Sequence, residues 1–204
     1  MNFEEWEPLY EEIVEYFGFA REDDERAAEI LSGLLLCDDL AMLDELCRGN
    51  DICVCGNAPC LEKEIPLVEG TVFAADAAAS VLYSHGIRPD AIFTDLDGAT
   101  EEFLDMNREG TVVVVHAHGD NIPQLNYWVP QFSGPLVGTT QSRPLSNVHN
   151  FGGFSDGDRA VFAAHSLGAA SITILGFDLS DPNVDPMKRG KLKWAKRLLA
   201  MLEP

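Results

Sequence analysis

Basic residues are scarce in this sequence. Its 204 residues contain 34 Asp and Glu against 14 Lys and Arg, only five of them Lys, for a formal net charge of −20. Nucleic-acid-binding proteins need basic surfaces, so this balance excludes nucleic acid as a partner. Such acidity fits a salt-rich cytoplasm, where the Debye length falls to ~3 Å at 1 M salt, and equally an ordinary acidic protein of a low-salt cell.

Long apolar runs are also absent. No stretch of 18 apolar residues occurs, so we expect no membrane span. The acidic N-terminus, Met1-Asn-Phe-Glu-Glu-Trp6, lacks the basic region that begins a signal peptide. Five cysteines, an odd number without an export signal, indicate reduced thiols. We therefore expect a cytoplasmic protein, whose 46% apolar residues are enough to build a core.

Residues 1–50 predict helices. Apolar residues between Phe3 and Phe17 recur at helical spacing, and a second stripe runs from Ala27 to Leu35. These fifty residues hold 15 of the 34 acids and three of the 14 bases. We expect a small helical N-terminal segment, residues 1–50, that packs on the main domain and keeps its acidic face in solvent.

From residue 51 onward, short apolar strands alternate with helices. Strands are expected near 52–55, 71–75, 91–94, 111–115, 136–137 and 171–177. Such alternation predicts a mostly parallel sheet with helices on both faces, which is an α/β fold. The strands are almost wholly apolar, as expected when both faces of the sheet are covered. We therefore assign residues 51–204 to one α/β domain.

Three predicted strand–helix junctions carry carboxylates. They are at Asp76, at Asp95-Leu-Asp97, and at Asp156-Gly-Asp158. Ligands of open parallel sheets bind at the carboxyl ends of the strands. Carboxylates that converge there repel one another unless a cation lies among them, and Mg²⁺ prefers oxygen ligands and phosphates. We predict a Mg²⁺ site made by Asp95, Asp97 and Asp158; the alternative is a set of solvated helix caps.

Two features suggest phosphate contacts. The small side chains after Asp76 would let an anion approach a helix N-terminus. Residues 188–197 hold six of the 14 basic residues, and we predict that Lys188 and Lys191 bind a triphosphate. The alternative is a basic surface helix, in which case Arg143 and Arg159 are the next candidates.

Polar loops suggest where a second substrate binds. Thr139, Thr140 and Gln141 offer hydrogen-bonding side chains, and Gly153 permits close approach of the backbone to a ligand. Aromatic residues Trp128, Phe151 and Phe154 are candidates for stacking on that ligand, although each also fits a core position.

The segment His116-Ala-His-Gly-Asp120 has two interpretations. His116, His118 and Asp120 have the spacing of zinc ligands at the end of a strand. A zinc hydrolase of this pattern has a further His where Asn121 stands. We therefore favour Asp120 as a catalytic carboxylate that binds Mg²⁺ directly or through its water shell, with imidazoles that contact phosphate or shape the loop.

Two segments resemble the thiamine pyrophosphokinases. Phe73–Gly98 is similar to that family's opening A-A-D-G-G, helix, G-I-x-P-D and G-D-x-D-S pattern, and Ser155–Gly176 to its later helix and strand. The family's Gly-Gly is replaced by Ala77-Ala78, and its closing G-G-R-x-D-H is absent. These departures point away from thiamine as the acceptor.

A sister family matches better. Six motifs, from about residue 50 to the C-terminus, resemble the archaeal 6-hydroxymethyl-7,8-dihydropterin diphosphokinases: Gly56-Asn-Ala-Pro59, Thr94-Asp-Leu-Asp-Gly98, His116-Ala-His-Gly-Asp-Asn121, Val137-Gly-Thr-Thr-Gln141, Asn150-Phe-Gly-Gly-Phe-Ser-Asp-Gly-Asp158 and Leu175-Gly-Phe-Asp178. The resemblance implies Mg²⁺-dependent transfer of diphosphate from ATP to the pterin, with release of AMP, in tetrahydromethanopterin or folate synthesis.

The resemblance also implies site residues. We assign nucleotide contacts to Gly56, Asn57, Pro59 and Asp76, and acceptor contacts to Asp156 and Asp178, beside the loop residues already named. A thiamine pyrophosphokinase and a non-catalytic nucleotide or sugar-nucleotide binding module are the open alternatives, as is assembly into a homodimer.

Overall fold

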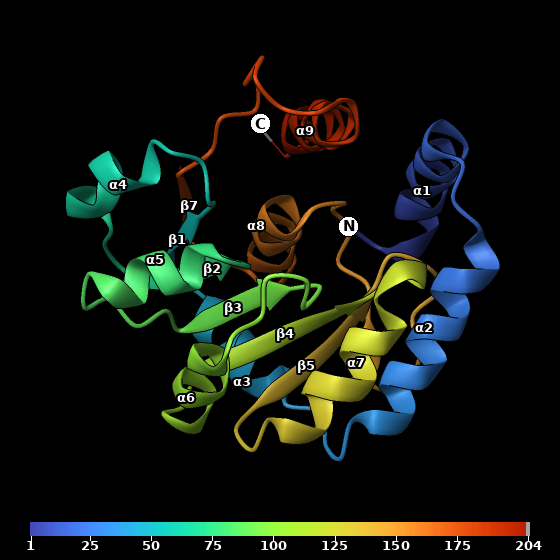
Figure 1. Cartoon of the computed structure of the whole chain (residues 1–204), viewed down its shortest axis with the longest axis horizontal. Helices are drawn as coiled ribbons and strands as arrows, with labels where there is room; N and C mark the ends of the chain where they lie inside the picture. The colour runs from blue at the N-terminus through green and yellow to red at the C-terminus, as the bar shows by residue number, and fades with distance from the viewer. Residues whose placement is uncertain (203–204) are drawn as a thin grey trace.

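A seven-stranded parallel sheet forms the centre of the molecule. The computed structural model describes residues 1–202 (Figure 1). The strands are β1 (Asp51–Cys55), β2 (Thr71–Ala75), β3 (Ala91–Thr94), β4 (Val112–Ala117), β5 (Leu136–Thr140), β6 (Val148–His149) and β7 (Ser171–Leu175). They lie in the order β6-β5-β4-β3-β2-β1-β7, and each neighbouring pair is parallel. The predicted α/β class is confirmed.

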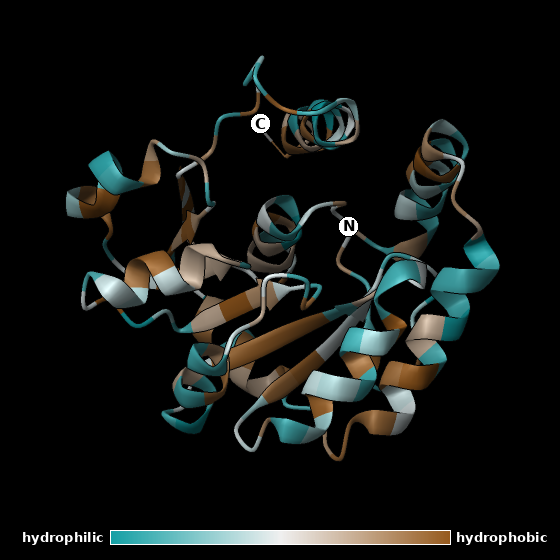
Figure 2. Cartoon of the chain, in the orientation of Figure 1, coloured by the Kyte–Doolittle hydropathy of each residue, from teal (hydrophilic) through white to brown (hydrophobic). Residues whose placement is uncertain are grey.

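Helices cover both faces of the sheet. On one face lie α2 (Arg21–Leu34), α4 (Leu61–Glu64), α5 (Ala78–Ser84), α6 (Glu101–Arg108) and α7 (Ile122–Trp128), together with the 3₁₀ turns η1 (Ile65–Leu67), η2 (Gly119–Asn121) and η3 (Val129–Gln131). The other face is covered by α3 (Leu40–Cys47) and α8 (Asp156–Ser166). The strands are mostly apolar between these layers (Figure 2), as burial on both faces requires.

A third layer lies outside α8. Here α1 (Phe3–Phe17) and α9 (Pro186–Leu199) pack through a separate apolar cluster. Trp6 and Tyr10 of α1 are fully buried against Phe162 of α8 and Trp194 of α9 in this cluster. The basic run of the sequence therefore lies on α9, in this third layer (Figure 1).

The N-terminal helical segment is confirmed, and its helices have different positions. α1 belongs to the third layer, α2 packs on β4, β5 and β6, and α3 lies on the opposite face of the sheet. A domain boundary at residue 50 stays a prediction. None of the helices in the described part of the chain is long and apolar enough to cross a membrane.

Candidate active site

Three carboxylates meet at the carboxyl edge of the sheet. Asp76 follows β2, Asp95 follows β3, and Asp156 begins α8. One carboxylate oxygen from each lies within 4.8 Å of the other two. Among residues 1–202 these three side chains, here called the carboxylate trio, form the one group of three or more potential metal ligands at such distances.

The local backbone explains how the trio forms. Asp76 (φ 46°) and Leu96 (φ 71°) adopt the left-handed conformation, which is uncommon outside glycine and costs about 1–3 kcal/mol. Thr94 donates a hydrogen bond of 2.7 Å to Asp76 Oδ1. A Cβ at Gly98 would overlap the Asp76 carboxylate, so glycine at this position leaves room for that side chain. The strained turns and the glycine together direct Asp76 toward Asp95.

The trio concentrates negative charge in a partly buried place. Burial and the neighbouring Asp95 raise the pKa of Asp76, and they hold the pKa of Asp156 well above its ordinary value. Burial alone would raise the pKa of Asp95 too, but hydrogen bonds from His118 and the Asp97 N–H lower it to about 2. The trio offers only oxygen ligands, and its carboxylates disfavour one another's ionisation unless a cation lies between them. Both properties are typical of a site for a hard divalent cation such as Mg²⁺.

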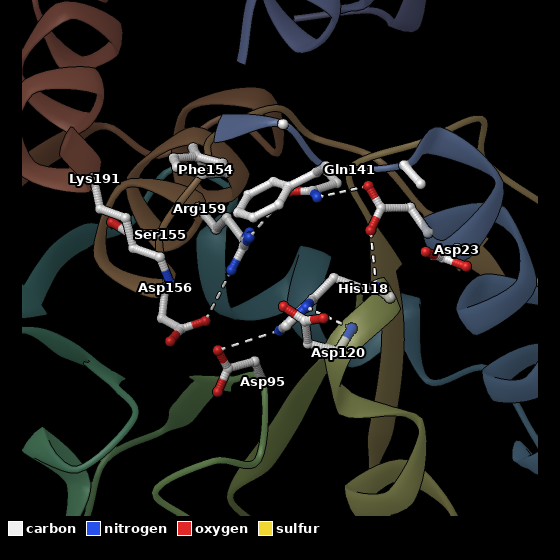
Figure 3. A pocket seen from close by; sticks show the side chains of 15 residues that line it. Asp23, Asp95, His118, Asp120, Gln141, Phe154, Ser155, Asp156, Arg159 and Lys191 are labelled. Carbon is white, nitrogen blue, oxygen red and sulfur yellow. Dashed lines mark hydrogen bonds and ion pairs between the residues drawn. The ribbon is translucent and has the colours of Figure 1, made fainter. Parts of the chain in front are cut away.

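Two basic side chains flank Asp95 and Asp156 of the trio (Figure 3). The buried Arg159 places Nη1 3.1 Å from Asp156 Oδ1 and donates from Nη2 to Gln141 Oε1 at 3.4 Å, while its Nε has no partner among the described residues. His118 Nε2 lies 3.5 Å from Asp95, and its Nδ1 accepts from the Asp120 N–H. An accepting Nδ1 leaves Nε2 as the ring nitrogen that donates toward Asp95.

Two cavities meet at the trio. The wide cavity, of about 500 Å³, includes all six predicted nucleotide contacts in its lining: Gly56, Asn57, Pro59, Asp76, Lys188 and Lys191. The narrow cavity, of about 270 Å³, is lined on one side by Gln141, Phe154 and Arg159. Ser155, Asp156 and Lys191 line both. A ligand in each cavity would therefore have its reacting end beside Asp156.

Comparison with known proteins identifies the family of this chain. The model of the family described as MptE-like 6-hydroxymethylpterin diphosphokinase matches residues 30–184. The chain belongs to the MptE-like family. Similar proteins named 6-hydroxymethyl-7,8-dihydropterin pyrophosphokinase occur in Methanothermobacter thermautotrophicus (39% identical, covering 100% of this chain and 96% of the relative) and Pyrococcus furiosus (45%, covering 88% and 79%). A third protein of the same name, from Methanocaldococcus jannaschii, is 34% identical, and the match covers 100% of this chain and 96% of the relative.

Two predicted metal ligands lie outside the trio of this MptE-like protein. Asp158 is fully buried, and its carboxylate accepts from the backbone N–H groups of Phe154 (2.6 Å) and Ser155 (2.8 Å) at the start of α8. It caps the helix, and the geometry favours Asp156 as the third carboxylate. Asp97 is exposed and accepts from Gln124 at 3.0 Å.

The predicted acceptor residues are dispersed. Gln141 and Asp156 line the narrow cavity, whereas Asp178 lines the wide one. Thr139 hydrogen-bonds His116 and the Val115 carbonyl within the sheet, and Thr140 pairs with Ser142; neither lines a cavity described above. At Gly153 (φ 86°) a Cβ would lie 2.7 Å from the Arg159 backbone, so this glycine allows close packing on α8.

Other candidates also have positions that the sequence did not indicate. Asp120 is exposed and lines the narrow cavity outside the trio. His116 is buried, and the metal-ligand group found in residues 1–202 includes neither His116 nor His118, which argues against the zinc interpretation. Arg143 is exposed over the Phe3 ring, 6.0 Å from its centroid, and away from both cavities.

Three contributors to the site were missed or undervalued. The sequence indicates Arg159 only as an alternative phosphate contact; its i,i+3 spacing from Asp156 gives an ion pair because both residues lie in α8. Asp23 and Asp24 line the narrow cavity from α2. Nothing in their acidic sequence context distinguishes them from the other charged residues of that helix.

Proposed function

We propose that this MptE-like protein transfers diphosphate from ATP to the hydroxymethyl group of 6-hydroxymethyl-7,8-dihydropterin and releases AMP. The observation that carries the proposal is the carboxylate trio at the junction of two cavities. The names of the three relatives supply the acceptor.

The wide cavity suits the nucleotide. It has about twice the volume of the narrow cavity, and two lysines of α9, Lys188 and Lys191, line it beside the trio. Lysines offset phosphate charge that a metal leaves unbalanced. A Cβ at Gly56 would lie 2.6 Å from the Gly176 carbonyl, so only glycine permits the β1 and β7 ends to converge at the cavity wall.

The reaction is an in-line displacement. The substrate hydroxyl oxygen forms a bond to the β-phosphorus, the bond from that phosphorus to the oxygen bridging the α-phosphorus breaks, and AMP leaves with the electron pair. The hydroxyl proton passes to solvent. Mg²⁺ held by the trio would supply charge neutralisation at the phosphates.

The protein's own residues do the positioning. Lys191 lines both cavities and can contact a phosphate as it moves from one ligand to the other. Arg159 keeps Asp156 in place through their ion pair at 3.1 Å. Fixing the hydroxyl and the β-phosphorus in line contributes most of the rate in such transfers.

One incubation tests the proposal. The purified protein is mixed with ATP and Mg²⁺ and either the reduced pterin or thiamine, and AMP and the diphosphate product are quantified. We expect AMP and pterin diphosphate in equal amounts, and only background AMP with thiamine. AMP with thiamine alone would indicate a thiamine pyrophosphokinase, and bound but unreacted ATP with both acceptors would indicate a binding module.

A further inference from the structure

The N-terminal helices build one end of the narrow cavity. Asp23 and Asp24, at the start of α2, line it together with Phe19 and Ala20. Asp23 lies at the end of the cavity opposite Asp156 and Lys191 (Figure 3). The cavity therefore has a phosphate end, where it joins the wide cavity, and a far end made by α2.

Asp24 is held rigidly at this far end. Its buried carboxylate accepts hydrogen bonds from Tyr10 Oη (2.7 Å), Gln141 Nε2 (2.8 Å) and the Gly119 N–H (2.9 Å). These donors come from α1, from the end of β5 and from the turn after β4. Three of about four acceptor positions of the carboxylate are thus occupied, so Asp24 acts chiefly to position its neighbours.

Gln141 is fixed by the same network. Its amide NH₂ donates to Asp24, and its amide oxygen accepts from Arg159 Nη2. Each polar atom of the amide has one protein partner, and these two contacts fix the orientation of the Gln141 side chain at the cavity wall. We therefore assign direct recognition of the acceptor to other groups.

The groups that remain are complementary to a neutral heterocycle. Arg159 Nε is buried and has no partner within residues 1–202, which leaves one N–H donor on the cavity flank. Asp23 is exposed, and its side chain packs beside Gly119 at the far end, where a carboxylate can accept from N–H groups. A carboxylate that accepts two parallel N–H bonds recognises an amino–amide edge well.

We propose that the narrow cavity binds a neutral bicyclic ring with its amino–amide edge on Asp23 and its hydroxymethyl group toward Asp95 and Asp156. A ring nitrogen nearer the hydroxymethyl group then accepts from Arg159 Nε, since Arg159 lies beside Asp156. Phe154, which lines the cavity, provides an apolar wall for the ring face. This inference rests on the proposed function, and it makes helices α1 and α2 the part of the chain that selects the acceptor.

Binding measurements without turnover test this assignment. The probes are 6-hydroxymethylpterin, followed by its fluorescence, and α,β-methylene-ATP with Mg²⁺, followed by calorimetry. Asp23→Asn should weaken pterin binding about tenfold or more, since a hydrogen bond to a charged group is lost. Its affinity for the nucleotide analogue should stay within about twofold. Glu22→Gln is the matched control, because it makes the same charge change on an exposed, neighbouring position outside the cavity.

The outcomes separate this inference from the proposed function. Unchanged pterin affinity in Asp23→Asn would overturn the inference while the function stands. Wild-type protein that binds thiamine and no pterin would overturn the function itself. Phe177 lines the wide cavity. If Phe177→Leu weakened pterin binding while Asp23→Asn bound pterin normally, the acceptor site would be the wide cavity and the inference would be refuted.

The positioning role of Asp24 has its own readout. Tyr10→Phe removes one donor to Asp24 and should raise the pterin KM several-fold, with kcat and the ATP KM nearly unchanged. Tyr16→Phe, on the exposed face of the same helix, is the control. A lower melting temperature with an unchanged pterin KM would show a purely structural role and contradict the positioning role.

Discussion

Asp156 and Asp158 are two residues apart, and the structure predicts opposite consequences of neutralising them. Asp156→Asn removes a charge from the carboxylate trio. It should lower kcat by about 10² or more, because loss of a metal-ligand charge removes at least about 2.7 kcal/mol of transition-state stabilisation.

The fold should tolerate the Asp156 change. At an effective dielectric constant of ~20, repulsion from each of the two other carboxylates, at up to 4.8 Å, destabilises the charged Asp156 by about 3 kcal/mol. Attraction to Arg159 at 3.1 Å stabilises it by about 5 kcal/mol. Asparagine removes all three interactions together. These contributions nearly cancel, and asparagine also removes the cost of burying a charge, so the melting temperature should stay level or rise by a few degrees.

Asp158→Asn should show the reverse. It replaces a charged acceptor for two backbone N–H groups at the start of α8 by a neutral one, and the difference between hydrogen bonds to charged and to neutral groups is about 1–2 kcal/mol. For a chain of this size that corresponds to a fall of about 2–8 °C in melting temperature. Turnover per folded molecule should remain within about threefold of wild type.

The assay combines thermal melts with kcat measured across a Mg²⁺ titration for both variants. Asp156→Asn should also require more Mg²⁺ for half-maximal activity. If Asp158→Asn lost turnover and Mg²⁺ affinity while Asp156→Asn kept both, the choice of Asp156 as the third ligand would be wrong.

Three further predictions use other parts of the structure. Lys191→Ala should lower kcat and raise the ATP KM, whereas Lys188→Ala should raise the ATP KM alone, because only Lys191 lines both cavities; equal steady-state constants in the two variants would contradict this. Burial, together with the hydrogen bond to Asp24 and the Asp24 charge, raises the pKa of Tyr10. The contribution of the protonated Tyr10 to the free energy of unfolding is therefore full below pH ~10, the pKa in the unfolded chain, and falls above it by up to ~1.4 kcal/mol per pH unit. Urea unfolding between pH 8 and 11 should show a steeper loss in wild type than in Tyr10→Phe, and parallel curves would refute the assignment. The net charge of −20 predicts a melting temperature that rises with KCl toward molar concentrations, whereas a flat curve would show that self-repulsion is unimportant.

The parallel sheet could be predicted because its signals are local. Apolar strands such as Ile52–Cys55 and Val112–Val115 are recognisable from their own residues, and alternation with helices leaves few possible topologies. β6 could not be predicted, because it lacks such a local signal. It contains two residues, Val148 and His149, and is defined by pairing with Gly138 and Thr139 of β5 rather than by an apolar run.

The choice between Asp156 and Asp158 depended on a signal that the sequence did contain. Ser155 and Asp158 have the i,i+3 spacing of a capping box, and the structure has both reciprocal hydrogen bonds of that motif. Asp158 is fully buried and both of its oxygens accept from backbone N–H groups, so it is poorly placed to reach a metal beside Asp76 and Asp95. Interpreting the local motif first would have left Asp156 as the carboxylate free to join Asp76 and Asp95.

The role of Asp24 could not be predicted from local signals, because its partners are distant in the chain. Gln141 lies 117 residues away and Gly119 lies 95 away, and both donate to the same buried carboxylate. Through Gln141 and Arg159 this network continues to Asp156 of the trio. Loss of Asp24 would leave buried donors without partners, at about 1–3 kcal/mol each. The N-terminal helices are therefore coupled to the reaction centre by hydrogen bonds. A substitution in α1 or α2 should weaken binding of the acceptor more than binding of the nucleotide.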